Sequence, residues 1–107
     1  MAGKGLHEYT VQEAENLGLG QLGSTYADGT SITGITDGIV VAITMLTETT
    51  FTTLTPETSA FIEVGAKGYE DLGDTLANSD TFPKGATIYG RWTVVDVNNG
   101  NILAYFG

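Results

Sequence analysis

The pattern closest to a known chemical motif is Gly18-Leu-Gly-Gln-Leu-Gly23, which has the G-x-G-x-x-G spacing of a dinucleotide-binding turn. Such a site needs a strand before the glycines and a helix after them, so that the helix N-terminus meets the pyrophosphate. Here the only candidate helix precedes the motif, and Ser24-Thr-Tyr-Ala-Asp-Gly29 after it is typical of a turn. The sequence therefore argues against a nucleotide site.

Side chains for nucleophilic or acid–base catalysis do not form a recognisable set. His7 is the only histidine, and it stands beside Glu8 in an N-terminal stretch without periodicity that would hold it in place. No second histidine or lysine base occurs in a known motif with the serines, which are Ser24, Ser31, Ser59 and Ser79. We expect no catalytic residues and predict that the protein is not an enzyme.

Carboxylates crowd one segment, residues 70–80, which contains Glu70, Asp71, Asp74 and Asp80. Oxygen ligands at this spacing would hold Ca²⁺ if the loop folded around the ion, but the Asp-x-Asp-x-Asp core of an EF-hand is absent. A solvated acidic loop is the default interpretation, with calcium left open. The chain has no cysteine, so disulfides and thiolate metal sites are excluded, and we expect no cofactor.

The composition describes one small acidic domain. The chain has 107 residues, of which 41% are hydrophobic and 16% charged, and its net charge is −9. This balance suits a globular protein with a single core. Strong negative charge disfavours binding to nucleic acid or to an anionic membrane. Neither a signal peptide nor a run of about 20 apolar residues is present, so we expect synthesis in the cytoplasm.

Arg91-Trp92 is the one dipeptide typical of an interface hot spot. Adjacent residues of a strand face opposite sides, so at most one of the two belongs to the core. We expect Trp92 in the core beside Val94, and Arg91 pointing outward toward an acid.

The positioning elements are short strands between turns. Residues 1–20 are expected to form an arm, with a capping-box pattern at Thr10-Val-Gln-Glu13 that fits either a short helix or irregular chain. Residues 18–38 are interpreted as loop with short extended pieces such as 31–35. The expected strands are Ile39–Thr47, central and covered on both faces, then Thr50–Leu54, which Pro56 ends, and Phe61–Val64. A surface loop with one helical turn follows over residues 69–80.

The chain is predicted to end in a β-hairpin with arms 86–97 and 102–106 and a type I′ turn at Asn99-Gly100. A two-residue loop would set Val97 opposite Ile102. The shared inner face would comprise Val95, Val97, Ile102, Ala104 and Phe106. The predicted fold is a mainly β, small single-domain β-sandwich or barrel over residues 21–107, after the arm 1–20.

The C-terminal half resembles small proteins from the virion gene clusters of tailed bacteriophages. The resemblance lies in the turn Pro83-Lys-Gly85, the strand Thr87-Ile-Tyr-Gly-Arg-Trp-Thr93, the closing segment 100–105 and the threonine-rich segment 46–54. It implies a capsid decoration (cement) protein that binds the major capsid protein on the head surface, forms a homotrimer and stabilises the lattice by bridging subunits. The residues expected at its interfaces are Val11, Leu17, Leu19, Tyr89, Arg91, Tyr105 and Phe106.

Two other functions stay open. The first is a tail, neck or head-fibre component of the virion that binds host glycan, for which exposed Trp92, Tyr89 and Tyr105 would be the stacking surface. The second is a small calcium-dependent hydrolase acting through the acidic loop.

Overall fold

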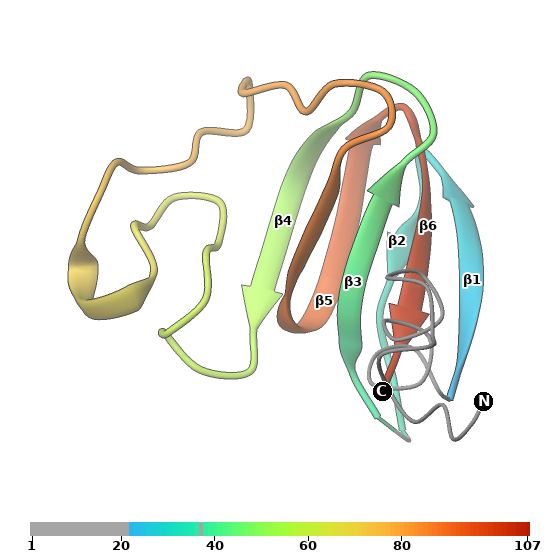
Figure 1. The fold of residues 1–107 in the computed structure, drawn as a ribbon, viewed down its shortest axis with the longest axis horizontal. Helices are drawn as coiled ribbons and strands as arrows, with labels where there is room; N and C mark the ends of the chain where they lie inside the picture. The colour runs from blue at the N-terminus through green and yellow to red at the C-terminus, as the bar shows by residue number, and fades with distance from the viewer. Residues whose placement is uncertain (1–21, 37) are drawn as a thin grey trace, which may run out of the picture.

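The computed structural model describes residues 22–36 and 38–107, which form one antiparallel sheet curled into a nearly closed barrel (Figure 1). Its strands are β1 (Gly23–Asp28), β2 (Ser31–Ile32), β3 (Val40–Met45), β4 (Thr50–Pro56), β5 (Thr87–Asn99) and β6 (Asn101–Phe106), with one 3₁₀ turn, η2 (Tyr69–Asp71). The strand order is β1-β6-β3-β5-β2, and β4 also pairs with β5. The mainly β prediction is confirmed, and of its two architectures the chain adopts the barrel.

Strand β3 is central, as predicted, because it pairs with β5 on one side and β6 on the other. A strand with its ordinary period of two would put Val40 and Ile43 on opposite faces, and the structure departs from this alternation. Val40, Ile43 and Met45 are all fully buried in the core, since the register of both ladders shifts between Val40 and Ala42. A β-bulge adds one residue to a strand and so reverses the facing of everything beyond it.

The two C-terminal strands follow each other as predicted, with Gly100 alone between β5 and β6, and the chain reverses direction there (Figure 1). The predicted cross-strand register is wrong: Val97 pairs with Phe51 of β4, and Ile102 pairs with Ala27 of β1 and Met45 of β3. The inner face is nonetheless correct, since Val95, Val97, Ile102 and Ala104 are buried and Phe106 packs against them. Which side chains point into the core depends on the alternation of side chains along each strand, and not on which strand it pairs with.

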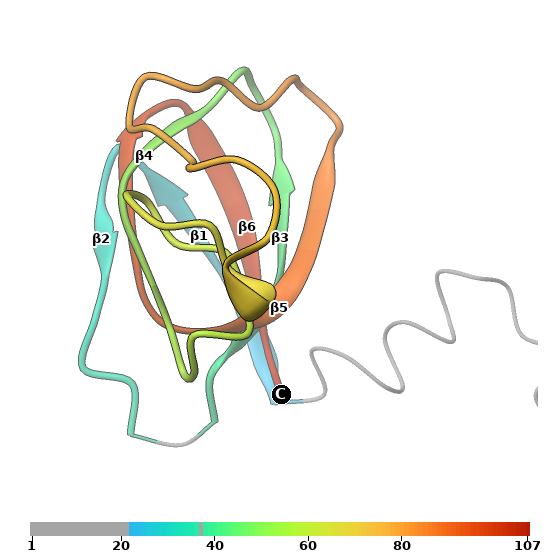
Figure 2. The ribbon, with the colours of Figure 1, turned by 90° about the vertical axis from the view of Figure 1, so that its left-hand side faces the viewer.

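Strand β5 curves around the barrel, with its first half beside β3 and its second half beside β4 and β2 (Figure 2). Trp92 pairs with both Val40 of β3 and Pro56 of β4, so it lies where β5 passes from one strand to the other. It is fully buried, as predicted, although Val95 and not Val94 shares the core with it because the register shifts there. Its indole covers Gly90, where a Cβ would stand 2.7 Å from the ring. Glycine at position 90 therefore makes room for Trp92.

The chain between β4 and β5, residues 57–86, is a long excursion that lies across one end of the ring of strands (Figure 2). The indole Nε1 of Trp92 donates a 2.9 Å hydrogen bond to the carbonyl oxygen of Ile62, and Phe82 packs edge-on against Phe51 with ring centroids 5.4 Å apart. The strand expected over residues 61–64 is absent; Val64 makes a single bridge to Leu76. The helical turn expected in residues 69–80 is η2.

Strand β1 corrects the sequence prediction, which has a turn at Ser24-Thr-Tyr-Ala-Asp-Gly29. It pairs along its whole length with β6, and Ala27 reaches the core. The expectations for residues 1–20, including the arm and the capping box, lie outside the described residues. No helix in the described part of the chain has the length and apolar character needed to cross a lipid bilayer.

Candidate functional site

The outer surface of the wall formed by β1, β6, β3 and β5 brings together tyrosines from three strands. Backbone pairing sets Tyr105 of β6 opposite Ser24 of β1 and opposite Ala42 of β3, and Ala42 opposite Tyr89 of β5. Residues paired across antiparallel strands point to the same side of the sheet. Tyr89, of which 50% is exposed, and Tyr105 therefore lie on one surface, in one row across the sheet.

The neighbouring row runs in the same direction and is also uncharged. It joins Tyr26 to Leu103, Leu103 to Thr44 and Thr44 to Thr87. The hydroxyls of Thr44 and Thr87 lie 3.0 Å apart, and the amide Nδ2 of Asn101 donates a 2.7 Å hydrogen bond to the Tyr26 hydroxyl. We call this surface the tyrosine face; its residues are Ser24, Tyr26, Thr44, Thr87, Tyr89, Leu103 and Tyr105.

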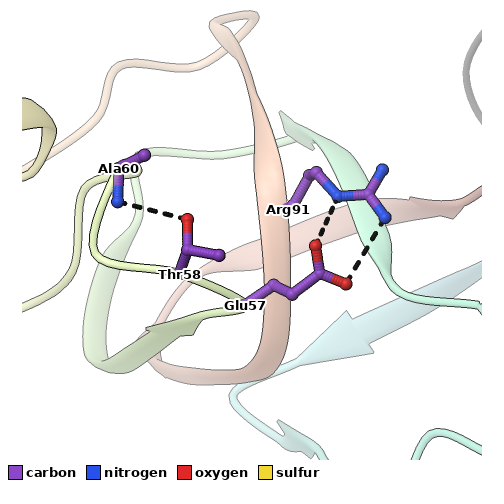
Figure 3. A network of polar contacts seen from close by, with 4 residues as sticks. All are labelled: Glu57, Thr58, Ala60 and Arg91. Atoms are coloured by element: carbon purple, nitrogen blue, oxygen red, sulfur yellow. Dashed lines mark hydrogen bonds and ion pairs between the residues drawn. The ribbon is translucent and has the colours of Figure 1, made fainter.

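Arg91 points outward, as predicted, and pairs with an acid at the start of the excursion (Figure 3). Its Nε lies 2.7 Å from Oε1 of Glu57, its second guanidinium nitrogen lies 3.4 Å from Oε2, and the Glu57 amide donates to the Arg91 carbonyl at 2.7 Å. The hydrogen bond from Arg91 lowers the pKa of the Glu57 carboxyl, and the same bond raises the pKa of the guanidinium. This arrangement fastens the excursion to β5.

Phe106 faces inward and borders a cleft of about 600 Å³ between β1, β2 and the segment after β2. The cleft lies where the barrel wall stays open, because β1 and β2 are not hydrogen-bonded to each other. Among the described residues, its walls combine hydroxyl, aliphatic and aromatic side chains and no charged one. They are Leu22, Thr25, Tyr26, Ala27, Thr30, Ser31, Ile32, Thr33, Gly34, Ile35, Thr36 and Phe106.

Other residues singled out from the sequence are not brought together. Val11, Leu17 and Leu19 lie outside the described residues, as does most of the glycine motif. Its last glycine, Gly23, opens the strand β1, where a dinucleotide site would need a helix. The described segment thus gives the motif no nucleotide-binding context.

The acidic loop does not gather its carboxylates. Within residues 22–36 and 38–107, no group of three histidine, cysteine, aspartate or glutamate side chains lies close enough to hold a metal ion. Asp80 instead accepts a 2.8 Å hydrogen bond from the amide of Ala77, which closes a local turn. Glu70 and Asp71 stand in η2 with positive φ and are exposed. This loop provides no candidate site in the described structure.

Tyr26 is the functional candidate that the sequence did not reveal. The sequence does contain one indication of a strand here: between Gly23 and Gly29 stand two residues that favour β-strands, Thr25 and Tyr26. Comparisons of the chain with protein-family models, with curated proteins and with solved structures found no match. The tyrosine face and the neighbouring cleft are therefore interpreted from their geometry and chemistry alone.

Proposed function

We propose that this chain is a non-enzymatic structural protein of a phage particle, which docks on the capsid lattice through the tyrosine face. The observation that carries the proposal is an uncharged, aromatic sheet surface on a chain whose net charge is −9. Cores of protein interfaces are depleted in charge and enriched in tyrosine.

The charges of the molecule are separated in a way that suits docking. Most acidic residues of the described chain belong to the excursion, which projects from the β4 side of the barrel, while β1 and β6 lie at the other side (Figure 1). An acidic excursion turned to solvent would keep bound copies soluble and repel the phosphate backbone of DNA. The tyrosine face would then meet the lattice.

The resemblance of the C-terminal half to phage virion proteins supplies the finer part of the proposal. On that basis the partner is the major capsid protein, the location is the outer surface of the head, and the bound form is a homotrimer that bridges capsid subunits. Contacts made by the bound but not the unfolded state would stabilise the shell by mass action. The protein would reinforce the head without making or breaking a covalent bond.

The test is binding to particles. Capsids purified from cells that lack the gene are incubated with the wild-type protein, with Tyr89→Lys and with the matched control Tyr69→Lys, and bound protein is quantified after sedimentation. Tyr69 is a similarly exposed tyrosine on the excursion, at 62%. We expect hundreds of wild-type copies per particle, the same for the control, and at least a tenfold loss of affinity for Tyr89→Lys, which places a charge in the interface. Equal binding by the two variants would refute docking through this face.

A second candidate function is favoured by the uncharged, hydroxyl-lined cleft beside Tyr26, which suits a neutral polyhydroxyl ligand such as a host glycan. The chain would then be a tail, neck or head-fibre component. Trp92 cannot serve as a stacking platform because it is fully buried. Glycan binding that Tyr26→Ala abolishes, together with only a handful of copies per particle, would favour this function over decoration.

A further inference from the structure

Among the described residues, three strands have one edge without a ladder partner, and two of them carry the usual protection against strand addition. Strand β2 has only two residues. Strand β4 contains three register shifts and ends at Pro56. Short length, bulges and proline are the devices by which proteins block edge-to-edge pairing. The third edge is that of β1.

Strand β1 has none of these protections. It is six residues long, its ladder with β6 has no register shift, and it contains neither proline nor lysine. It is the last strand on its side of the barrel in Figure 1, with the open cleft beside it. A regular unprotected edge of this kind is a template for another strand.

We propose that β1 pairs antiparallel with β1 of a second copy of this chain, about a two-fold axis midway between the two Tyr26 residues. A two-fold axis perpendicular to the sheet keeps the outer faces of both copies on the same side. Paired residues must then have their side chains on the same side of the sheet. In a pair of identical strands this requires that one residue of β1 lies opposite its own copy at the centre of the ladder. Centring on Tyr26 sets Tyr26 opposite its own copy and Ser24 opposite Asp28, and uses the middle of the strand.

The charge distribution is the reason for choosing a second copy as the occupant. Two copies of a chain of net charge −9 repel each other least where the surfaces that meet carry few charges, and the tyrosine face together with β1 is such a region. The only charged residue of β1 is Asp28 at its end. In the Tyr26-centred register each Asp28 faces a Ser24 hydroxyl donor, and the two carboxylates are about 14 Å apart along the strands, well beyond the Debye length of about 8 Å.

The pairing would also extend the tyrosine face. Tyr26 already lies on the outer surface, held there by the hydrogen bond from Asn101. Its copy would lie directly opposite, within reach for aromatic packing across the strands. Two four-stranded walls would become one continuous sheet, with a docking surface twice as large. The self-pairing follows from the edge of β1 and holds whether or not the partner is a capsid. It joins two copies, so it is a contact separate from those of the homotrimer that the resemblance implies.

The first test is sedimentation equilibrium of the full chain over a wide concentration range. We expect a concentration-dependent dimer for the wild type and for Tyr69→Lys, and at least a tenfold weaker dimer for Tyr26→Lys, because this lysine would face its own copy. A wild type that stays monomeric at every concentration overturns the proposal, as does unchanged dimerisation of Tyr26→Lys.

The second test fixes the register and uses the absence of cysteine from the chain. A single Tyr26→Cys substitution places two thiols opposite each other, where antiparallel Cα atoms are about 4.5–5.5 Å apart, within disulfide range. We expect rapid covalent dimerisation on mild oxidation, at least tenfold faster than for Tyr69→Cys. Equal rates for the two variants would contradict pairing centred on Tyr26. Neither test contains a capsid, so failure of self-pairing and failure of docking are told apart.

Discussion

The two longer edge strands of this barrel, β4 and β1, have opposite surroundings. Strand β4 leads into the excursion, which Trp92, Phe82 and the Glu57–Arg91 pair fasten back onto the barrel. Strand β1 has a regular ladder with β6 on one side and an open cleft on the other. One edge is completed by its own chain, and the other has no ladder partner among the described residues, which is why we propose that a second copy pairs there. The acidic residues of the described chain follow the same division, since most of them lie on the excursion.

Among the variants that test how the excursion is fastened to the barrel, loss of Trp92 should lower the free energy of unfolding most. Trp92→Ala removes a fully buried indole at the bend of β5, and we expect a loss of about 3–5 kcal/mol in the free energy of unfolding, measured by urea titration. Trp92→Phe keeps an aromatic ring in the core but removes the indole donor to the Ile62 carbonyl together with part of the buried ring. This variant should lose about 1–3 kcal/mol and expose the excursion to protease. A Trp92→Phe protein as stable and as protease-resistant as the wild type would contradict this role.

We expect an intermediate loss of stability from substitutions at Gly29, between β1 and β2, and at Gly100, between β5 and β6. The amide of Gly29 donates a 3.1 Å hydrogen bond to the carbonyl of Gly100. Both have positive φ, 59° at Gly29 and 102° at Gly100, but only Gly100 is crowded: a Cβ there would lie 2.7 Å from Oγ1 of buried Thr49. Gly29 has open space around it. We expect Gly29→Ala to cost about 1–2 kcal/mol and Gly100→Ala clearly more, by urea titration. Equal losses would show that the backbone conformation alone matters.

The smallest effect should come from Arg91→Ala, because both partners of the ion pair are about half exposed. Arg91 lowers the pKa of Glu57 below its ordinary value of 4.5, so the folded state binds the proton less tightly than the unfolded state. The pair therefore stabilises the fold above pH 4.5, and this contribution is lost as pH falls through the lowered pKa. We expect a slightly lower Tm for Arg91→Ala at neutral pH, a difference that vanishes in acid and in about 1 M salt. A difference that persists in acid would assign the effect to lost packing.

The positions of β3, β4, β5 and β6 and the inward face of the two C-terminal strands could be predicted from the sequence, because these features depend on local periodicity. The runs at 39–47, 50–54 and 86–106 are rich in β-branched and aromatic residues, and each contains a strand. The ladder partners could not be predicted. Asn99-Gly100 satisfies the local rules for the turn of a hairpin whose two strands pair with each other. In the structure, however, β6 pairs with β1 and β3, which are far away in the chain. The bulges in β3 and β4 likewise depend on both strands of a ladder.

The candidate site was predicted only in part for the same reason. Tyr89 and Tyr105, chosen as interface residues, do share one surface, although nothing in their spacing shows that Ala42 lies between them. Arg91 was also chosen, but its charge is used within the chain by Glu57. Tyr26 was missed because glycines on both sides of its strand are typical of turns. Its importance depends on an edge, and edges exist only once the sheet is assembled.

The most direct test of the contrast between the two edges is amide hydrogen exchange, resolved by residue, in dilute and in concentrated protein. In an antiparallel edge strand, every second amide points away from the sheet and is protected only when another strand is added. We expect these outward amides of β1 to exchange rapidly in dilute protein and to become protected as concentration rises, while exchange in β4 stays the same. Exchange in β1 that is independent of concentration, or protection that rises equally in both strands, would contradict the account.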